Sequence, residues 1–323
     1  MRHLLACASG ALLLASVAHA APPDLFAAKP LAFERAPQAK VVGVYVPSWE
    51  PAALLDRLQP GSVSHLLYAF ARICGPGQLE KDAAACTGQP DFTLAAGPKE
   101  AEFDAAFQRL KQQRLPQVKV LASVGGWGGS DPFFHIANDP ARRAVFAASV
   151  QRFLREHPGF DGVDIDWEHP GDNGAANGTK LGDPADGQGY AELMDALREA
   201  VDALGRETGR RYLVTTAVNP ARAIVGRINF RQAAHALDLV FMMSYDFYGP
   251  WTDTIGNHTG LMPSAPGADD SVDSAVRNFV AAGVPASKLV AGVAMYGRGF
   301  AGVARPATGQ PRGQVFPPGG DGS

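Results

Sequence analysis

The sequence predicts an α/β fold, and within that class a (β/α)8 TIM barrel that is incomplete. Two observations support this prediction. Seven short apolar runs alternate with longer amphipathic stretches between residues 39 and 300. Polar residues gather at the C-terminal ends of five of these runs. In a barrel these ends meet at one mouth, where barrel proteins carry their functional residues.

The apolar runs have the composition of parallel strands that are covered on both faces. Each is short, almost continuously apolar, and bounded by turn formers or polar residues. They are residues 41–46, 65–70, 118–124, 162–167, 212–218, 239–245 and 289–295. Amphipathic patterns between them predict helices at 100–114, 140–156, 190–207 and 271–282. Strands that alternate with helices predict right-handed βαβ units.

An open doubly wound sheet is the competing architecture, because the strand spacings fit both. The segments SVGGW, DWE, NP, SYD and YGR follow five successive strands. An open sheet places a site only at its switch point, whereas a barrel uses all of these ends. The barrel is therefore the better prediction. No strand pattern follows Phe300, so 301–323 are expected to form an irregular tail and strand eight to be absent.

Bulk composition excludes some classes of partner. The 323 residues are 46% hydrophobic, and 29 basic against 32 acidic residues give a net charge of −3. No basic excess exists to neutralise phosphates, so nucleic acid is not an expected partner. No segment after the N-terminal one is long and apolar enough to span a membrane, so we expect no membrane partner.

The N-terminus is typical of an exported protein. Residues 1–20 predict a signal peptide, with a short polar start, an apolar stretch and a cleavage site near Ala20. A membrane anchor is the weaker alternative, because about 20 uninterrupted apolar residues are needed to span a bilayer. Residues 21–38 are rich in Pro and Ala and predict a linker. We therefore expect secretion to the periplasm or the extracellular space.

Signal cleavage leaves two cysteines, Cys74 and Cys86. Two cysteines in an exported chain are expected to form a disulfide. Two free thiols are the alternative.

Residues 161–170, DGVDIDWEHP, place acids among residues that favour burial. Side chains of a strand alternate between its faces. Asp164, Asp166 and Glu168 therefore share one face, and Val163, Ile165 and Trp167 share the other. We expect the apolar face to pack on the outer helices and the acids to point inward. Asp161 has the opposite parity and is expected to be structural.

Three interpretations of the acidic ladder, which consists of Asp164, Asp166 and Glu168, are possible. A solvated acidic face conflicts with the interleaved apolar residues. A Mg²⁺ or Ca²⁺ site conflicts with acids spread over about 13 Å of a straight strand. Paired-acid chemistry fits best, because burial and like charges raise carboxyl pKa values. Glu168, nearest the mouth, is then the candidate general acid.

The ladder and its companions resemble the family 18 glycoside hydrolases, the chitinases. DGVDIDWE matches their DxxDxDxE signature, and SVGGW, MSYD and MYGRGF resemble their motifs on strands three, six and seven. The segments DPFF and NGTKLGDPADGQGY are similar to those of large, secreted bacterial chitinases. The resemblance covers residues 40 to 305.

The resemblance implies an endo- or exo-acting chitinase that hydrolyses β-1,4-linked N-acetylglucosamine with retention and substrate assistance. Glu168 would protonate the glycosidic oxygen, while the substrate's own acetamido oxygen attacks the anomeric carbon. Asp166 would hold the acetamido N–H, and Asp164 would share a proton with Asp166. Tyr245 would hydrogen-bond the acetamido carbonyl.

A second set of residues is implied to bind substrate or to support the acids. The set is Tyr45, Ser123, Gly126, Trp127, Met243, Asp246, Tyr296 and Arg298. Tyr45 and Ser123 are expected to support the Asp164–Asp166 pair, and Trp127 to stack on a sugar ring. Chitin and chito-oligosaccharides are the expected partners of a monomer that uses no cofactor or metal.

The large members of this family carry an α+β insertion between strands seven and eight, followed by a strand-eight Trp. Neither is present by residue 323, so the resemblance implies a C-terminally truncated member with residues 39–300 as its barrel. Three alternatives stay open: a non-catalytic chitin-binding lectin, an endo-β-N-acetylglucosaminidase acting on glycans, and an inactive truncated product. Lectins on this scaffold typically lack the acid, so the presence of Glu168 makes the lectin the weaker alternative.

Overall fold

A computed structural model describes residues 40–172, 180–304 and 312–315. The predicted signal peptide at 1–20 and the predicted linker at 21–38 lie outside the described residues. Among the described helices, none has the length and apolar character needed to cross a lipid bilayer.

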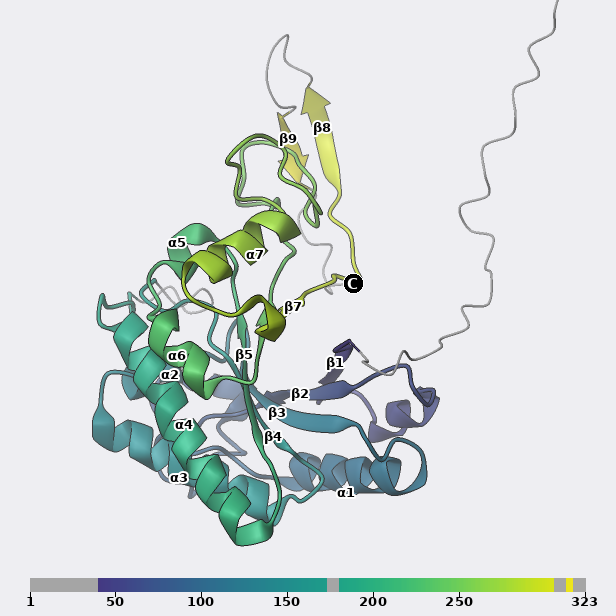
Figure 1. Cartoon of the computed structure of the whole chain (residues 1–323), viewed down its shortest axis with the longest axis vertical. Coiled ribbons are helices and arrows are strands. Elements are labelled where there is room, and N and C mark those ends of the chain that lie inside the picture. The colour runs from purple at the N-terminus through teal and green to yellow at the C-terminus, as the bar shows by residue number, and fades with distance from the viewer. Residues whose placement is uncertain (1–39, 173–179, 305–311, 316–323) are drawn as a thin grey trace, which may run out of the picture. The chain divides into compact units, whose positions relative to one another are not determined.

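Seven parallel strands form one sheet in chain order (Figure 1). They are β1 (Gly43–Pro47), β2 (His65–Ala71), β3 (Lys119–Gly125), β4 (Gly162–Asp166), β5 (Leu213–Val218), β6 (Leu239–Met242) and β7 (Leu289–Ala291). Each strand pairs with the next one along the chain. All seven predicted strands are confirmed, and β6 and β7 are shorter than their apolar runs.

The helices lie between the strands in sequence. They are α1 (Pro98–Gln113), α2 (Pro132–Ile136), α3 (Pro140–Glu156), α4 (Asp186–Thr208), α5 (Arg222–Val225), α6 (Phe230–Ala236) and α7 (Val272–Ala281), with short 3-10 helices η1 (Ala52–Arg57), η2 (Glu80–Asp82) and η3 (Ala286–Lys288). The four predicted helices are confirmed as α1, α3, α4 and α7. The other elements are too short to show a helical period in the sequence.

Local signals fix the ends of the long helices. The Asp139 side chain caps α3 by accepting hydrogen bonds from the backbone N–H groups of Ala141 and Arg142. Helix α4 ends at Thr208, and the capping residue Gly209 has a φ of 69°, the left-handed conformation that glycine adopts without a Cβ clash.

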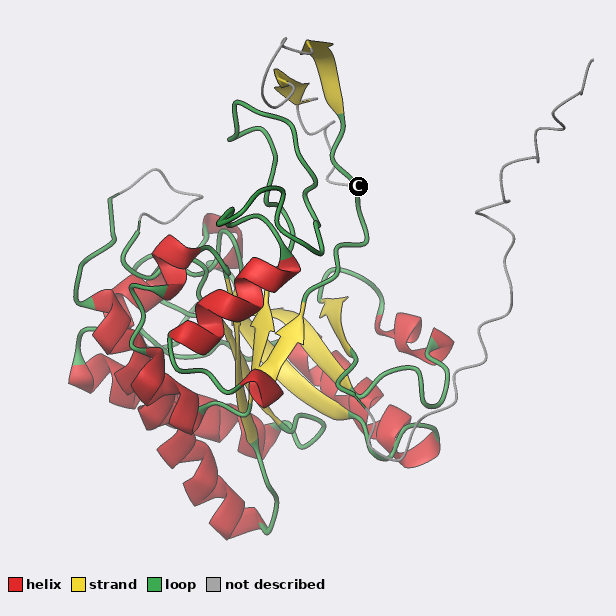
Figure 2. Cartoon of the chain, turned by 45° about the horizontal axis from the view of Figure 1, so that its top comes forward, coloured by secondary structure: helices red, strands yellow, loops and turns green. Residues whose placement is uncertain are grey.

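The sheet has two chemically different faces. Its outer face packs against helices, as Figure 2 shows, in a large apolar core that includes Val163, Ile165 and Trp167. Its inner face carries a small cluster of Leu67, Leu121, Ala217 and Phe241. The predicted separation of apolar and acidic side chains across β4 is therefore confirmed.

The sheet is curved, because side chains from distant strands meet across its inner face. The rings of Tyr45 on β1 and Phe241 on β6 lie 6.5 Å apart, although four strands separate them in the sheet. Curvature, parallel pairing in chain order and outer helices are the features of a (β/α)8 barrel. Seven of its eight strands lie within the described residues.

The expectation that no strand follows Phe300 was wrong. Two short strands, β8 (Phe300–Ala304) and β9 (Arg312–Val315), pair antiparallel. The segment is rich in Gly and Pro, so it contains no continuous apolar run that would predict a strand. Only the pairing of its backbone defines the two strands. Neither one pairs with the seven-stranded sheet among the described residues.

Candidate active site

Strand β4 places Asp164 and Asp166 on the inner face of the sheet. Asp164 is fully buried and Asp166 is 4% exposed. Asp164 is paired in register with Ser123 on β3 and Thr215 on β5, and Asp166 with Gly125 and Ala217. Each acid is therefore held between two neighbouring strands, and short side chains flank it.

Three hydroxyl groups donate to Asp164. Ser123 Oγ lies 2.8 Å from Oδ2, Thr215 Oγ1 lies 2.6 Å from Oδ1, and Tyr45 Oη lies 3.4 Å from Oδ2. Burial raises the pKa of Asp164 to about 6, and the three hydrogen bonds oppose that rise because they stabilise the ionised form. The structure thus brings Tyr45 and Ser123 to Asp164, one of the two acids that they were expected to support.

Asp166 has a less satisfied environment. Its Oδ1 atom is buried and has no hydrogen-bond partner among the described residues. Burial raises its pKa well above the ordinary value, and the charges of Glu168 and Asp164 add to the rise. A buried acceptor without a donor is costly, and such groups mark places where a ligand can complete the bonding.

Glu168 follows the end of β4, and its side chain is 13% exposed. Burial raises its pKa to about 7, with a contribution from the negative charge of Asp246. A carboxyl group with this pKa is protonated in a large fraction of molecules near neutral pH. It is therefore suited to donate a proton to a leaving group.

The carboxylate of Asp246 connects the ends of β6 and β7. Arg298 donates from Nε (2.9 Å) and Nη2 (2.7 Å) to its Oδ1, and the Tyr296 hydroxyl donates to its Oδ2 at 2.6 Å. Asp246 has a φ of 58°, in the left-handed region that few non-glycine residues adopt. Strained residues of this kind cluster at functional sites.

Tyr245 precedes Asp246 and lies near the acids. Burial raises its pKa, and the negative charge of Asp166 adds to the rise. Its ring contacts that of Tyr296 edge-on, with 6.4 Å between the centroids. Met243 packs against the inner apolar cluster, two residues before Tyr245.

Two glycines at the end of β3 allow the chain to pass close to β4. Gly125 has a φ of 113°, and a Cβ there would lie 2.3 Å from the carbonyl oxygen of Asp166. Gly126 has a φ of 81° and donates its N–H to the same oxygen at 3.0 Å. This turn presents Trp127, which is 59% exposed, next to the acids' strand.

Sequence reasoning did not assign three residues of this region to the chemistry. They are Thr215, His169 and His258. His258 accepts from the backbone N–H of Asp246 at its Nδ1 (3.4 Å), and its Nε2 lies 3.1 Å from the carbonyl oxygen of Tyr296. It thereby ties the loop after β6 to the segment after β7. Only the folded structure, which places His258 beside Asp246 and Tyr296, identifies it as part of this region.

Asp161 is structural, as expected. Its carboxylate accepts from the backbone N–H of Val120 at 2.8 Å and pairs with Lys111 at 2.6 Å and Arg210 at 3.1 Å. These contacts lie at the start of β4, at the opposite end from Glu168.

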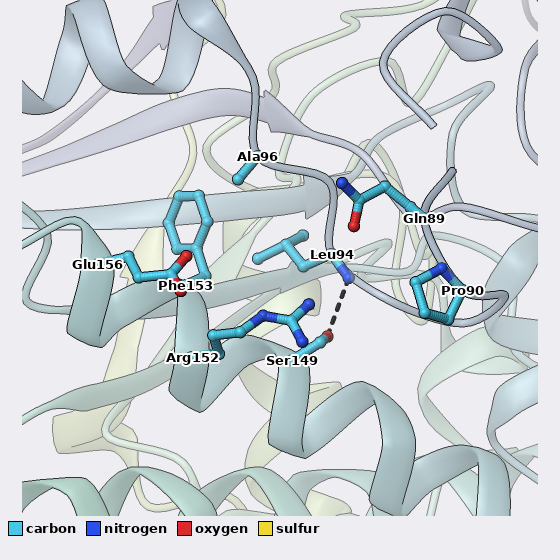
Figure 3. A pocket seen from close by; sticks show the side chains of 8 residues that line it. All are labelled: Gln89, Pro90, Leu94, Ala96, Ser149, Arg152, Phe153 and Glu156. Atoms are coloured by element: carbon cyan, nitrogen blue, oxygen red, sulfur yellow. Dashed lines mark hydrogen bonds between the residues drawn. The ribbon is translucent and has the colours of Figure 1, made fainter. Parts of the chain in front are cut away.

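A surface hollow lies away from these acids, between α3 and the segment after Cys86 (Figure 3). In it the Ser149 hydroxyl accepts a hydrogen bond from the backbone N–H of Leu94 at 2.9 Å. The hollow belongs to the outer helical layer and contains no pair of carboxylates. Among the described residues, no group of three or more His, Cys, Asp or Glu side chains has an arrangement that could hold a metal ion.

Fold and site together define a class. The chain is a (β/α)-barrel protein with buried carboxylates at the C-terminal end of strand four. The sequence model of glycosyl hydrolases family 18 matches residues 41–319, so the chain belongs to that family.

Individual relatives agree with this assignment. Chitinase A of Pseudoalteromonas piscicida is 35% identical over 312 residues, which cover 82% of this chain and 38% of that protein. The structure of chitinase ChiA74 from Bacillus thuringiensis is similar with a TM-score of 0.69 at 30% identity, covering 88% of this chain and 52% of that one. The structure of a family 18 N-acetylglucosaminidase from Paenibacillus barengoltzii is similar with a TM-score of 0.68 at 27% identity. The match covers 86% of this chain and 76% of that one. The chain thus spans well under two thirds of the first relative.

Proposed function

We propose that this protein is a chitinase that hydrolyses β-1,4 linkages between N-acetylglucosamine units with retention of configuration. One observation carries the proposal. The buried acids of β4 lead to Glu168, a carboxyl group whose pKa burial raises to about 7. A proton donor of this strength is what cleavage of a glycosidic bond requires near neutral pH.

In the proposed reaction, Glu168 gives its proton to the glycosidic oxygen as the bond to the anomeric carbon breaks. The acetamido oxygen of the same sugar forms a new bond to that carbon, which gives a cyclic oxazolinium ion. Water then attacks the carbon and returns a proton to Glu168, and the acetamido group re-forms. No second nucleophile from the protein is needed, consistent with the substrate-assisted chemistry of the family.

The other acids have proposed roles around the acetamido group. Asp166 accepts its N–H, and the unpartnered Oδ1 atom of Asp166 supports this role. Asp164 shares a proton with Asp166, and Tyr245 donates to the acetamido carbonyl. The exposed indole of Trp127 offers an aromatic face to a sugar ring.

We also propose that the protein is exported as a monomer and that Cys74 and Cys86 form a disulfide. Their Cα atoms lie 5.3 Å apart, within the usual span of a disulfide. Export follows from the predicted signal peptide, and an oxidising compartment favours the pairing. N-terminal sequencing of the secreted protein, with cleavage expected near Ala20, tests the export.

Paired chromogenic substrates test the function. A chitobioside carries the acetamido group, and the matching cellobioside has a hydroxyl in its place. We expect release of the chromophore from the chitobioside alone, because only that substrate carries the nucleophile. Comparable hydrolysis of both, or of neither, would contradict the proposal. Product lengths from longer chito-oligosaccharides then distinguish endo from exo action.

A further inference from the structure

His169 directly follows Glu168 and has an unusual environment for a buried histidine. It is 8% exposed. Its Nε2 atom is buried and makes no hydrogen bond to any described residue. The same atom lies 3.8 Å from Oε2 of Glu168, just beyond hydrogen-bonding distance. A small movement of the Glu168 carboxyl group would close this gap.

The imidazole ring packs against an aromatic side chain, and burial favours its neutral form. Its centroid lies 4.8 Å from that of the Trp127 indole, in an edge-on contact. Burial lowers the pKa of His169, while the charges of Asp172 and Asp131 oppose that change. A neutral imidazole carries one N–H group and one free lone pair. It can therefore donate to a carboxylate without adding a positive charge to the site.

We propose that His169 is a positioning residue for Glu168, whose carboxylate accepts a hydrogen bond from His169 Nε2–H once it has given up its proton. This inference rests on the proposed role of Glu168 as the acid. The two atoms are 3.8 Å apart, so this hydrogen bond is not formed in the present arrangement of the two side chains. When the proton leaves, the new negative charge draws the N–H group toward Oε2. His169 keeps its own proton throughout.

A hydrogen bond from His169 to Glu168 should change the pH dependence of kcat/KM. A donor that bonds the ionised form of a carboxyl group lowers its pKa. Removing the donor should raise the pKa of Glu168, so that Glu168 stays protonated to higher pH. The alkaline limb of the kcat/KM profile should then move upward. Since a weaker acid transfers its proton more slowly, kcat at the optimum should fall.

The test compares His169→Phe with His169→Gln. Phenylalanine keeps a ring against Trp127 and removes the N–H, and glutamine keeps an N–H group near the position of Nε2. For His169→Phe we expect the alkaline limb to rise by about one pH unit and kcat to fall about tenfold, with KM unchanged. In His169→Gln, the position of the alkaline limb and the value of kcat should both lie closer to those of the wild type. If the phenylalanine variant does not fold, His169→Leu takes its place.

His157→Phe is the matched control, because His157 is also buried but stacks on Phe153 outside the site. It should change thermal stability and leave the pH profile as in the wild type. A direct titration separates this inference from the proposed function, since it needs no substrate. Carbon-13 NMR of Glu-labelled protein, with the Glu168 signal assigned by its loss in Glu168→Gln, should show a higher pKa in His169→Phe.

Three results would overturn the inference. The pKa of Glu168 could move by less than about 0.3 unit in His169→Phe. The variant could raise KM while kcat stays the same, which would make His169 a substrate contact. The His157→Phe control could shift the alkaline limb equally. A protein without hydrolytic activity but with the NMR shift would refute only the proposed function.

Discussion

Thr215 on β5 donates a hydrogen bond of 2.6 Å to Oδ1 of Asp164 on β4. Asp164 thus receives donors at both oxygens, because Ser123 Oγ reaches Oδ2 from β3 on the other side. The strands that flank β4 hold this carboxylate in one orientation. They also keep its pKa lower than burial alone would set it.

Thr215→Val removes one of these donors and changes the shape very little. The pKa of Asp164 should rise above about 6, because the ionised form loses a hydrogen bond. We expect kcat to fall about tenfold, corresponding to the loss of roughly 1.4 kcal/mol. Thr216→Val is the control, because its hydroxyl donates to the carbonyl oxygen of Ile165 on the outer side. It should lower stability only, and an equal loss of kcat in both variants would contradict the role of Thr215.

The negative charge of Asp246 contributes to the raised pKa of Glu168. Glu168 must be protonated to act as the acid, so wild-type kcat/KM should decline above about pH 7. Asp246→Asn removes the charge, lowers the pKa of Glu168, and should move this limb to lower pH by several tenths of a unit. Asp253→Asn, an exposed residue of the same loop, should leave the limb in place. A limb that rises in Asp246→Asn would contradict the electrostatic account.

We expect ionised Asp166 to lower the free energy of unfolding at neutral pH. Its pKa is raised in the folded protein, so the folded state binds more protons than the unfolded chain above pH 4. Stability from this group is therefore lost as pH rises. Asp166→Asn should raise the free energy of unfolding at pH 7.5 by roughly 0.5–2 kcal/mol while activity falls sharply. The gain should shrink at pH 4, and a gain that is independent of pH would rule out this origin.

The proposed disulfide between Cys74 and Cys86 would close a short loop with a sequence separation of 12. The double variant with serine at both positions should lose about 3 kcal/mol of stability in the chain-entropy estimate. Activity at low temperature should stay unchanged, since the cysteines contact Ala95 in a cluster apart from the acids. Denaturant unfolding with and without reductant measures the loss. Wild type that is insensitive to reductant would argue against the disulfide.

The sequence was most informative where periodicity and chemistry coincide. The apolar runs predicted all seven parallel strands, because continuous apolarity is what two-sided burial requires. Strand parity separated Asp164 and Asp166 from Val163, Ile165 and Trp167, and the structure places the two sets on opposite faces.

Other features have no local signal. Thr215 lies in an apolar run in which threonine is also a common strand former, so its bond to Asp164 depends on the register of β4 and β5. His258 lies twelve residues after Asp246, and only folding of the loop brings the two together. The hairpin of β8 and β9 was missed because pairing of its backbone, rather than an apolar pattern, defines it.

The most direct test of the central claim is the rate of chitobioside hydrolysis by Glu168→Gln. Glutamine keeps the size of the side chain and cannot give up a proton. We expect kcat/KM to fall by at least about 100-fold, the lower range for loss of a general acid. Glu199→Gln, the same change at an exposed position of α4, should retain the wild-type rate. Equal rates for Glu168→Gln and the wild type would contradict the assignment of Glu168 as the proton donor.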